Sequence, residues 1–256
     1  MTTPATATTI DDEISSVVEL RRYRLLPGTR EVLIDLFDRE FVETQEAADM
    51  RVIGQFRDLD DPDSFVWLRG FRDMPSRAAA LERFYTGSVW AAHRDQANGT
   101  MVNSDNVLLL RPASPGSGIV PLDEPRPQPG ACEARPGLVV ATIAYLAPRT
   151  EEAFVAFFEE TLRPLLTVTQ ASAKVLATLV TERSPNTFPR LAIREGESVF
   201  VWLMSFPSLP AYESHLTALT RAEEWTRCAL PEMARRTWRA NEVWQLTPTG
   251  RSRLHG

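Results

Sequence analysis

A stretch of four residues, Phe65-Val66-Trp67-Leu68, returns 135 positions later as Phe200-Val201-Trp202-Leu203. The same spacing relates further identical pairs: Phe71 and Phe206, Pro75 and Pro210, Leu81 and Leu216, Trp90 and Trp225, Asn106 and Asn241. A fixed internal spacing of this kind indicates two copies of one structural unit. A chain of 256 residues is long enough for two domains that each bury a core.

Each copy shows the same predicted order of elements, β-α-β-β-α-β, which is the ferredoxin-like unit. Asp73 or Ser76 is expected to cap the second helix of the first copy, and Gly87 to interrupt it. The first copy has strands at 17–25, 50–57, 65–71 and 107–110 and helices at 29–48 and 78–97. The second has strands at 138–146, 174–182, 199–206 and 242–246 and helices at 151–166 and 209–236.

The fold class that we predict is α+β, with tandem ferredoxin-like (βαββαβ) repeats forming a dimeric α+β barrel-type architecture. The two sheets would pack face to face, within one chain or between the chains of a homodimer. The expected parts are a disordered tail (1–16), a first domain (17–112), a proline-rich linker (113–136), a second domain (137–247) and a short tail (248–256).

Composition and charge exclude several classes of function. A net charge of −6 leaves no basic surface of the kind that binds nucleic acid. No run approaches the roughly 18 apolar residues that span a membrane, and the N-terminal residues lack the regions of a secretory signal. The two cysteines, Cys132 and Cys228, suit a reduced compartment. We therefore expect a cytoplasmic protein whose partner is a small molecule, not nucleic acid or a membrane.

Alternation of side chains along the strands sorts the polar residues of the first copy. Val18 and Leu20 are expected to face the helices. The opposite face is expected to lie between the two sheets and carries Glu19, Arg21, Tyr23, Gln55, Arg57, Trp67 and Arg69.

Aligning the two copies suggests that the second has kept the shape of this face and lost its charges. Offsets of 122 to 135 residues match Glu19 with Ala141, Arg21 with Ile143, Tyr23 with Tyr145, Gln55 with Thr178, Arg57 with Val180, Trp67 with Trp202 and Arg69 with Met204. A space between the sheets would then have one arginine-rich wall and one apolar wall, which is typical of ligand sites. The alternative interpretations are a salt-bridge network between the sheets without a ligand, or a sheet face that is exposed to solvent.

Histidines supply the candidates for proton transfer and metal binding. His93 and Asn98 lie on the second helix of the first copy, where His93 could act as a general acid or base. His215, on the matching helix of the second copy, could be an axial haem ligand. A glycine-rich phosphate loop, a Cys/His cluster and a Gly-x-Ser-x-Gly elbow are absent, so no metal or organic cofactor is expected.

The first copy resembles the NIPSNAP family over about residues 17–112. The resemblance rests on the segments 18–23, 27–28, 54–56, 65–69, 90–98 and 104–107. Residues 137–247 look like a degenerate second copy without the Glu/Arg face. The family belongs to the dimeric α+β barrel superfamily, which implies the same fold. That superfamily includes cofactor-free monooxygenases, cyclases, isomerases, haem chlorite dismutases and binding modules, so the resemblance implies no single activity.

The leading hypothesis is a cofactor-independent oxygenase, cyclase or isomerase whose aromatic or polyketide-like substrate carries an anionic or carbonyl group and lies between the sheets. The alternatives are a non-catalytic NIPSNAP-like binding or scaffold protein and a haem-binding, chlorite-dismutase-like protein. The candidate catalytic residues are Glu19, Arg21, Arg69 and His93. The candidate substrate-binding residues are Tyr23, Gln55, Arg57, Trp67, Asn98, Tyr145 and Trp202.

Overall fold

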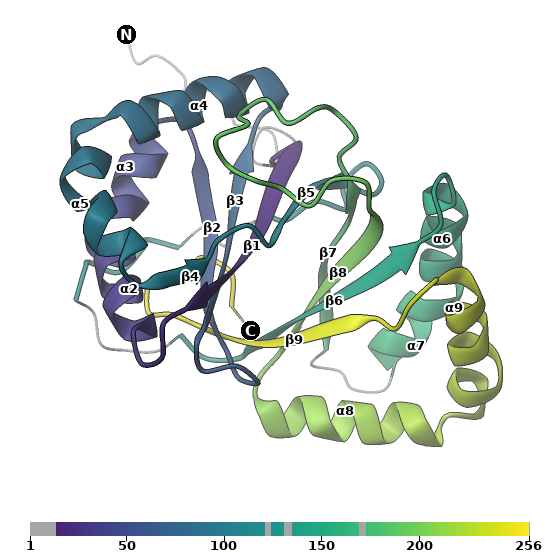
Figure 1. Ribbon diagram of the computed structural model, residues 1–256. Coiled ribbons are helices and arrows are strands. Elements are labelled where there is room, and N and C mark those ends of the chain that lie inside the picture. The colour runs from purple at the N-terminus through teal and green to yellow at the C-terminus, as the bar shows by residue number, and fades with distance from the viewer. Residues whose placement is uncertain (1–13, 121–123, 131–134, 169–172, 256) are drawn as a thin grey trace, which may run out of the picture.

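The computed structural model describes residues 14–120, 124–130, 135–168 and 173–255, and within them nine antiparallel strands form one sheet (Figure 1). Eight strands close into a barrel in the order β1-β3-β2-β9-β6-β8-β7-β5, and β4 pairs with β1 outside it. The strands are β1 (Val17–Leu25), β2 (Arg51–Asp58), β3 (Ser64–Phe71), β4 (Met101–Asn103), β5 (Val107–Pro112), β6 (Leu138–Leu146), β7 (Lys174–Thr181), β8 (Ser198–Phe206) and β9 (Glu242–Pro248).

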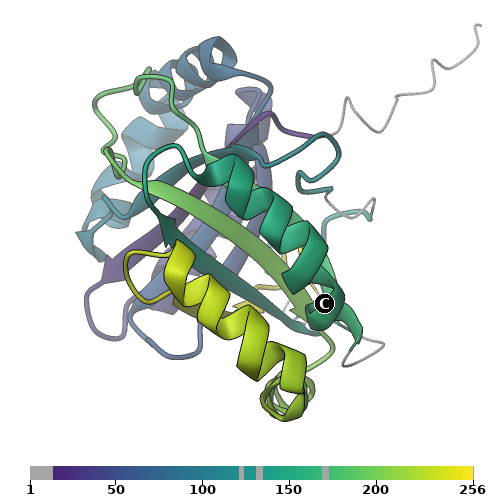
Figure 2. The ribbon, with the colours of Figure 1, turned by 90° about the vertical axis from the view of Figure 1, so that its right-hand side faces the viewer.

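The helices cover the outside of the barrel in two groups on opposite sides (Figures 1 and 2). A π-helical turn follows the first helix of each half, η1 (Phe37–Phe41) in one and η2 (Phe158–Leu162) in the other. The first group is completed by α2 (Arg30–Leu36), α3 (Val42–Ala47), α4 (Met74–Thr86) and α5 (Ser88–Asn98). The second is completed by α6 (Glu151–Phe157), α7 (Arg163–Val168), α8 (Leu209–Arg221), η3 (Trp225–Ala229) and α9 (Leu230–Arg236).

The predicted order of elements is found in each half of the chain. The Asp73 carboxylate caps α4 by accepting from the Ser76 backbone N–H at 2.6 Å, as predicted, because the first N–H groups of a helix have no partner within it. Gly87 separates α4 from α5. The expected helix at 209–236 is broken between α8 and η3, and β4 was not predicted.

One chain closes this barrel, because β2 pairs with β9 and β5 pairs with β7 across the two halves. The interior is filled by aliphatic and aromatic side chains from both halves, including Val18, Leu20, Leu68, Val201 and Leu246. The α+β barrel class is therefore as predicted. The expected pocket between the sheets is not: that space is a packed core.

The predicted face assignment was wrong, because Val18 and Leu20 point into the barrel. Tyr23 and Trp67 instead belong to the core between the strands and the first-half helices. Of the other residues of the predicted polar face, Glu19, Arg21, Gln55 and Arg69 are buried, whereas Arg57 is 30% exposed. The physical reason is that the barrel interior buries one face of β1 and the first-half helices cover the other, so apolar residues alone do not identify the helix side.

The predicted alignment of the first strands was also off by one residue. Glu19 lies opposite Arg69, and in the second half Val140 lies opposite Met204. The counterparts of Glu19, Arg21 and Tyr23 are therefore Val140, Thr142 and Ala144, and not Ala141, Ile143 and Tyr145. The β2–β3 and β7–β8 pairs do follow the predicted matches, with Gln55 and Thr178 opposite the two repeated tryptophans.

Segments that were expected to be a linker and a tail contribute to the packing. Ile119, in the proline-rich stretch, belongs to the barrel core. The C-terminal segment, expected to be a tail, has Thr249, Ser252 and Leu254 buried. Most of the expected N-terminal tail and Cys132 lie outside the described residues. Within the described ranges, no helix is long and apolar enough to cross a membrane.

Candidate functional site

Four buried charged side chains meet between the sheet and the helices of the first half. The Glu19 carboxylate accepts from Arg21 Nη1 at 2.6 Å and from Arg69 Nε at 2.7 Å on one oxygen. Its other oxygen accepts from Arg77 Nε at 2.7 Å. All four side chains are at most 1% exposed. We call Glu19, Arg21, Arg69 and Arg77 the arginine cluster.

The arginine cluster carries more positive than negative charge, since three guanidinium groups share one carboxylate and two charges stay unmatched within it. Burial alone would raise the pKa of Glu19, but Arg69, Arg21 and Arg77 outweigh it and hold that pKa well below its usual range. Glu19 therefore stays ionised, and the predicted role of Glu19 as a carrier of protons does not fit.

Three buried N–H groups at this cluster lack a hydrogen-bond partner: Arg69 Nη2, Arg77 Nη2 and Trp67 Nε1. Neutral groups accept hydrogen bonds from other donors of the cluster. Arg69 Nη1 donates to Gln45 Oε1 at 3.1 Å, and Arg21 Nε donates to the Tyr23 hydroxyl at 3.0 Å. Unmatched cations beside unpartnered donors form a site that an anionic oxygen would satisfy.

Aromatic rings surround the cluster. The Trp67 ring lies under both Arg21 and Arg69, with guanidinium carbons 5.4 and 5.0 Å from its centroid. A cavity of about 30 Å³ adjoins it and is lined mainly by aromatic side chains. Its lining consists of Tyr23, Leu33, Phe37, Phe41, Gln45, Trp67, Phe84, Tyr85, Trp90 and Met101. The Tyr23 phenol stays protonated at neutral pH, because burial raises its pKa.

Local structure explains why these groups meet. Alternate residues of a strand share a face, and the pairing of β1 with β3 places Glu19 opposite Arg69 and Arg21 opposite Trp67. On α4, Arg77 lies on the same stripe as Leu81 and Phe84, which packs against the sheet.

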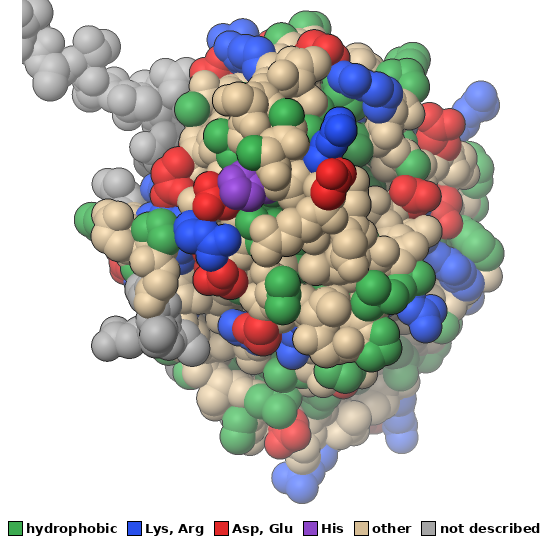
Figure 3. All heavy atoms as spheres, turned by 60° about the vertical axis from the view of Figure 1, so that its left-hand side comes forward, with side chains coloured by type: hydrophobic (Ala, Val, Ile, Leu, Met, Phe, Trp, Pro, Cys, Tyr) green, Lys and Arg blue, Asp and Glu red, His purple; other side chains and the backbone are tan. Residues whose placement is uncertain are grey.

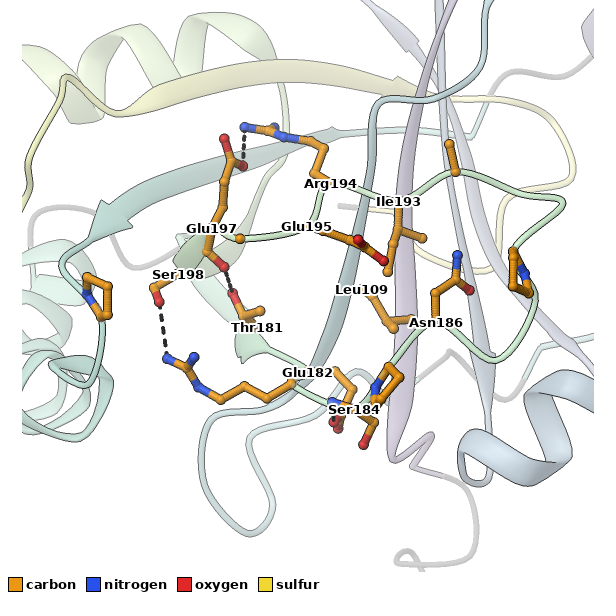
Figure 4. A pocket seen from close by; sticks show the side chains of 16 residues that line it. Leu109, Thr181, Glu182, Ser184, Asn186, Ile193, Arg194, Glu195, Glu197 and Ser198 are labelled. Carbon is orange, nitrogen blue, oxygen red and sulfur yellow. Dashed lines mark hydrogen bonds and ion pairs between the residues drawn. The ribbon is translucent and has the colours of Figure 1, made fainter.

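A wide cleft of about 750 Å³ lies beside the arginine cluster, under the connection between β7 and β8 (Figure 4). Figure 4 shows Leu109, Asn186 and Ile193 on one side of it and Thr181, Glu197 and Ser198 on the other. Most of its lining comes from residues 181–198 of the second half.

The structure brings together Glu19, Arg21, Tyr23, Trp67 and Arg69. Gln55 is buried on β2 opposite Trp67, and neither of its amide atoms has a hydrogen-bond partner.

Five of the predicted residues lie elsewhere. Arg57 pairs with exposed Glu31 at 2.6 Å, and Asn98 is exposed. His93 is 30% exposed, with Nε2 3.5 Å from Glu40 Oε2, and does not line the aromatic cavity. Tyr145 is in the barrel core, and Trp202 packs under the second-half helices.

Sequence reasoning missed Arg77, Gln45 and Asn186. A signal existed for Arg77, because a charged residue at helical spacing from Leu81 and Phe84 sits on an apolar stripe. Asn186 carried no local signal, since it comes from the other half of the chain and accepts from Arg77 Nη1 at 3.1 Å.

The second half offers no such cluster at the matching positions. The positions that match the four residues of the arginine cluster hold uncharged side chains. These are Val140 for Glu19, Thr142 for Arg21, Met204 for Arg69 and Tyr212 for Arg77. His215, the candidate haem ligand, is buried with its ring centroid 5.1 Å from that of Phe206. Among the described residues no group of three or more His, Cys, Asp or Glu side chains could hold a metal ion. On the face seen in Figure 3, acidic and basic side chains are interspersed.

A second buried carboxyl group predicts a pH effect on stability. Burial raises the pKa of Asp38, on η1, to about 6 from 3.8, although Arg251 and Arg126 oppose the shift. The folded state thus favours protonated Asp38, so folding loses stability as the pH rises from about 4 to about 6. Asp38→Asn should therefore stabilise the protein by about 1–3 kcal/mol at pH 8 and by almost nothing at pH 3.

Denaturant unfolding at both pH values measures this effect. Asp35→Asn is the matched control. The nearby Asp35 side chain, which pairs with Arg39, is 67% exposed, so this variant should show no such gain. An Asp38→Asn gain that does not change with pH would contradict the assignment.

Comparison with known proteins finds a family match within the first half. Residues 18–115 match the model of the NIPSNAP family, as the resemblance had implied. An uncharacterised NIPSNAP domain protein from Burkholderia xenovorans shares 22% identity over 38% of this chain and 95% of its own, with a TM-score of 0.36. No curated protein matches the chain.

Two solved structures are similar over nearly the whole chain. A candidate monooxygenase from Lactobacillus acidophilus NCFM has 12% identity and a TM-score of 0.54, covering 91% of this chain and 94% of its own. An anthrone oxidase-like protein has 13% identity and a TM-score of 0.54, covering 97% and 98%. At these identities the likeness concerns the fold alone, which is the α+β barrel.

Proposed function

We propose that the protein is a cofactor-independent oxygenase that acts on a hydrophobic aromatic molecule with an ionised phenol, enol or acid group. The observation that carries the proposal is the arginine cluster, with its unmatched charge and its unpartnered N–H groups beside Trp67. Fixed cationic donors in a buried layer stabilise an oxyanion far more than they would in water. The names of the two whole-chain structural neighbours agree with this class of reaction.

In the proposed reaction the protein mainly binds the anion, and the bound anion itself reacts with dioxygen. An electron-rich carbanion or phenolate reacts with dioxygen once its charge is held in place. For a ring methylene, the carbon loses two hydrogens and gains one oxygen atom as a carbonyl, while the second oxygen leaves as water. Glu19 stays a carboxylate and His93 lies outside the cavity, so neither is proposed to take a proton from the substrate. The substrate therefore binds already ionised.

The contributions of the site residues follow from their positions. Arg69 and Arg77 bind the oxyanion through their free Nη2 groups, and Trp67 donates from its indole nitrogen. Tyr23, Phe37 and the other rings of the aromatic cavity pack against the ring system of the substrate. Arg21 and Glu19 hold these groups in position.

Arg69→Met tests the proposal with two readouts. Alizarin, a dihydroxyanthraquinone dye whose absorption moves to longer wavelength on ionisation, should bind to the wild type as its anion. Anthrone should be oxidised with one dioxygen consumed per molecule. We expect Arg69→Met to reduce both by at least about 100-fold, since removal of one oxyanion donor has effects of this size.

Arg57→Met is the matched control, because Arg57 pairs with Glu31 away from the cluster, and it should leave both readouts unchanged. Turnover and binding that survive Arg69→Met in a folded protein would refute the proposal.

A scaffold protein is the second candidate, because both Glu19 oxygens are fully paired and the adjacent cavity is small. In that case Arg69→Met would change the melting temperature only, and alizarin would not bind to the wild type.

We further infer that the second half is a copy of the first that has lost the site. The shared register of the paired strands and the apolar residues Val140 and Met204 support this inference.

A further inference from the structure

The connection between β7 and β8 reaches from the second half onto the first. Residues 182–197 form this connection, whereas residues 59–63 suffice between β2 and β3. In Figure 1 it is the green segment that passes above the barrel towards α4. Its contacts there are the Phe188 ring stacked on Tyr85 at 5.7 Å, the Thr187 hydroxyl donating to the Met74 carbonyl at 3.3 Å, and Arg190 paired with Glu82 at 2.8 Å.

Two residues place the cleft of Figure 4 directly beside the arginine cluster. Leu109 lines the cleft and is the strand partner of Glu19. Asn186 also lines the cleft, and its Oδ1 accepts from Arg77 Nη1 at 3.1 Å. Thr187 Oγ1 accepts from the same nitrogen at 3.1 Å. A single layer of side chains therefore separates the cleft from Arg77.

The sizes of the two spaces differ by more than an order of magnitude. The aromatic cavity, at about 30 Å³, holds only a water or two. The cleft, at about 750 Å³, falls within the range of roughly 300–1,000 Å³ for small-molecule sites. A ligand of the proposed class fits the cleft as it stands and fits the cavity only after side chains move.

We propose that this cleft is the access chamber of the site and that Asn186 and Thr187 are its gate, so that the acidic group of an incoming aromatic anion binds at the free Nη2 of Arg77 and replaces their oxygens on Nη1. This inference rests on the function proposed above and adds the route and the residues that control it. The exchange is favourable, because a charge-assisted hydrogen bond to an anionic oxygen is stronger than one to a neutral amide or hydroxyl. The second half of the chain then serves to close the site of the first.

The accessibility of Arg77 tests the gate without any substrate. p-Hydroxyphenylglyoxal modifies arginine side chains, and peptide mass spectrometry measures the rate at Arg77. The variant Asn186→Ala/Thr187→Val removes both acceptors and should raise that modification rate about tenfold. A tenfold change corresponds to the loss of about 1.4 kcal/mol, which is the size expected for hydrogen bonds to neutral groups that keep the gate closed. Filling the cleft with Ala192→Trp should lower it severalfold.

Ala92→Trp is the matched control, since Ala92 is an equally exposed alanine on α5 and does not line the cleft. Glu195→Trp fills the same cleft from another exposed position and replaces Ala192→Trp if that variant does not fold. The proposal is overturned if the Arg77 rate is equal in the wild type and in the folded cleft-filling variant, or if opening the gate leaves it unchanged.

Alizarin kinetics separate the gate from the proposed function. Opening the gate destabilises only the closed free protein, so the double variant should bind faster with an unchanged dissociation rate. A faster dissociation would instead mean that Asn186 contacts the ligand. If the wild type binds no alizarin while the labelling rates change as expected, the oxygenase proposal fails and the access route stands.

Discussion

Glu19→Gln is expected to lower the free energy of unfolding by about 3–5 kcal/mol, because it leaves three buried guanidinium groups without a carboxylate. Glu31→Gln, which breaks the exposed pair with Arg57, should cost at most about 1 kcal/mol. Denaturant unfolding of both variants measures the difference. Equal costs would mean that the arginine cluster does not depend on its carboxylate.

The same variant has a predicted pH signature. A carboxylate whose pKa is depressed stabilises the fold above its unfolded pKa, near 4.5, and loses that contribution only as the pH falls through the folded value. The folded pKa of Glu19 lies well below its usual range, so the gap between wild type and Glu19→Gln should persist at pH 5. A gap that closes between pH 7 and pH 5 would contradict the low pKa.

The second prediction concerns a variant in which the four residues of the arginine cluster are replaced by those at the matching positions of the second half. The variant Glu19→Val/Arg21→Thr/Arg69→Met/Arg77→Tyr carries the residues found at the matching positions of the other half. We expect it to fold with unchanged or higher stability, because apolar replacement of a whole buried ion cluster is often neutral or stabilising by about 1–4 kcal/mol. Alizarin binding and anthrone oxidation should fall by at least about 100-fold.

Comparison of this variant with Glu19→Gln separates the two roles of the cluster. Removal of the carboxylate alone should cost stability, whereas removal of all four charges should cost function and leave stability intact. Loss of folding in the fourfold variant would show that the first half cannot accept the apolar pattern. Retained binding would show that the ligand site lies elsewhere.

The repeated sequence motif and the strand patterns carried enough information for the order of elements and the α+β barrel. β1 and β6 begin and end at the predicted residues, and Asp73 caps α4. Those features are local, because they depend on periodicity and on turn and cap chemistry within a few residues.

The orientation of the strands could not be predicted in the same way. Barrel closure through β2–β9 and β5–β7 depends on pairs far apart in the sequence, and it buries the face of β1 that the helices do not cover. Glu19 and Arg21 were therefore correctly grouped with Arg69 but placed on the wrong side of the sheet.

Arg77 and Asn186 were missed for a related reason. Arg77 comes from a helix, and Asn186 from the other half of the chain. The helical spacing of Arg77 from Leu81 and Phe84 places it on an apolar stripe, but the proximity of Arg77 and Asn186 to Glu19 depends on packing between elements, which no spacing in the sequence reports.

A crystal structure of the protein soaked with alizarin tests the central claim most directly. We predict ordered density for the dye against the Trp67 ring, with an anionic oxygen within hydrogen-bond distance of Arg69 Nη2 or Arg77 Nη2 and with Asn186 displaced. Unchanged side chains around Glu19, with the dye absent or bound elsewhere on the surface, would contradict the account and leave the arginine cluster as a purely structural feature.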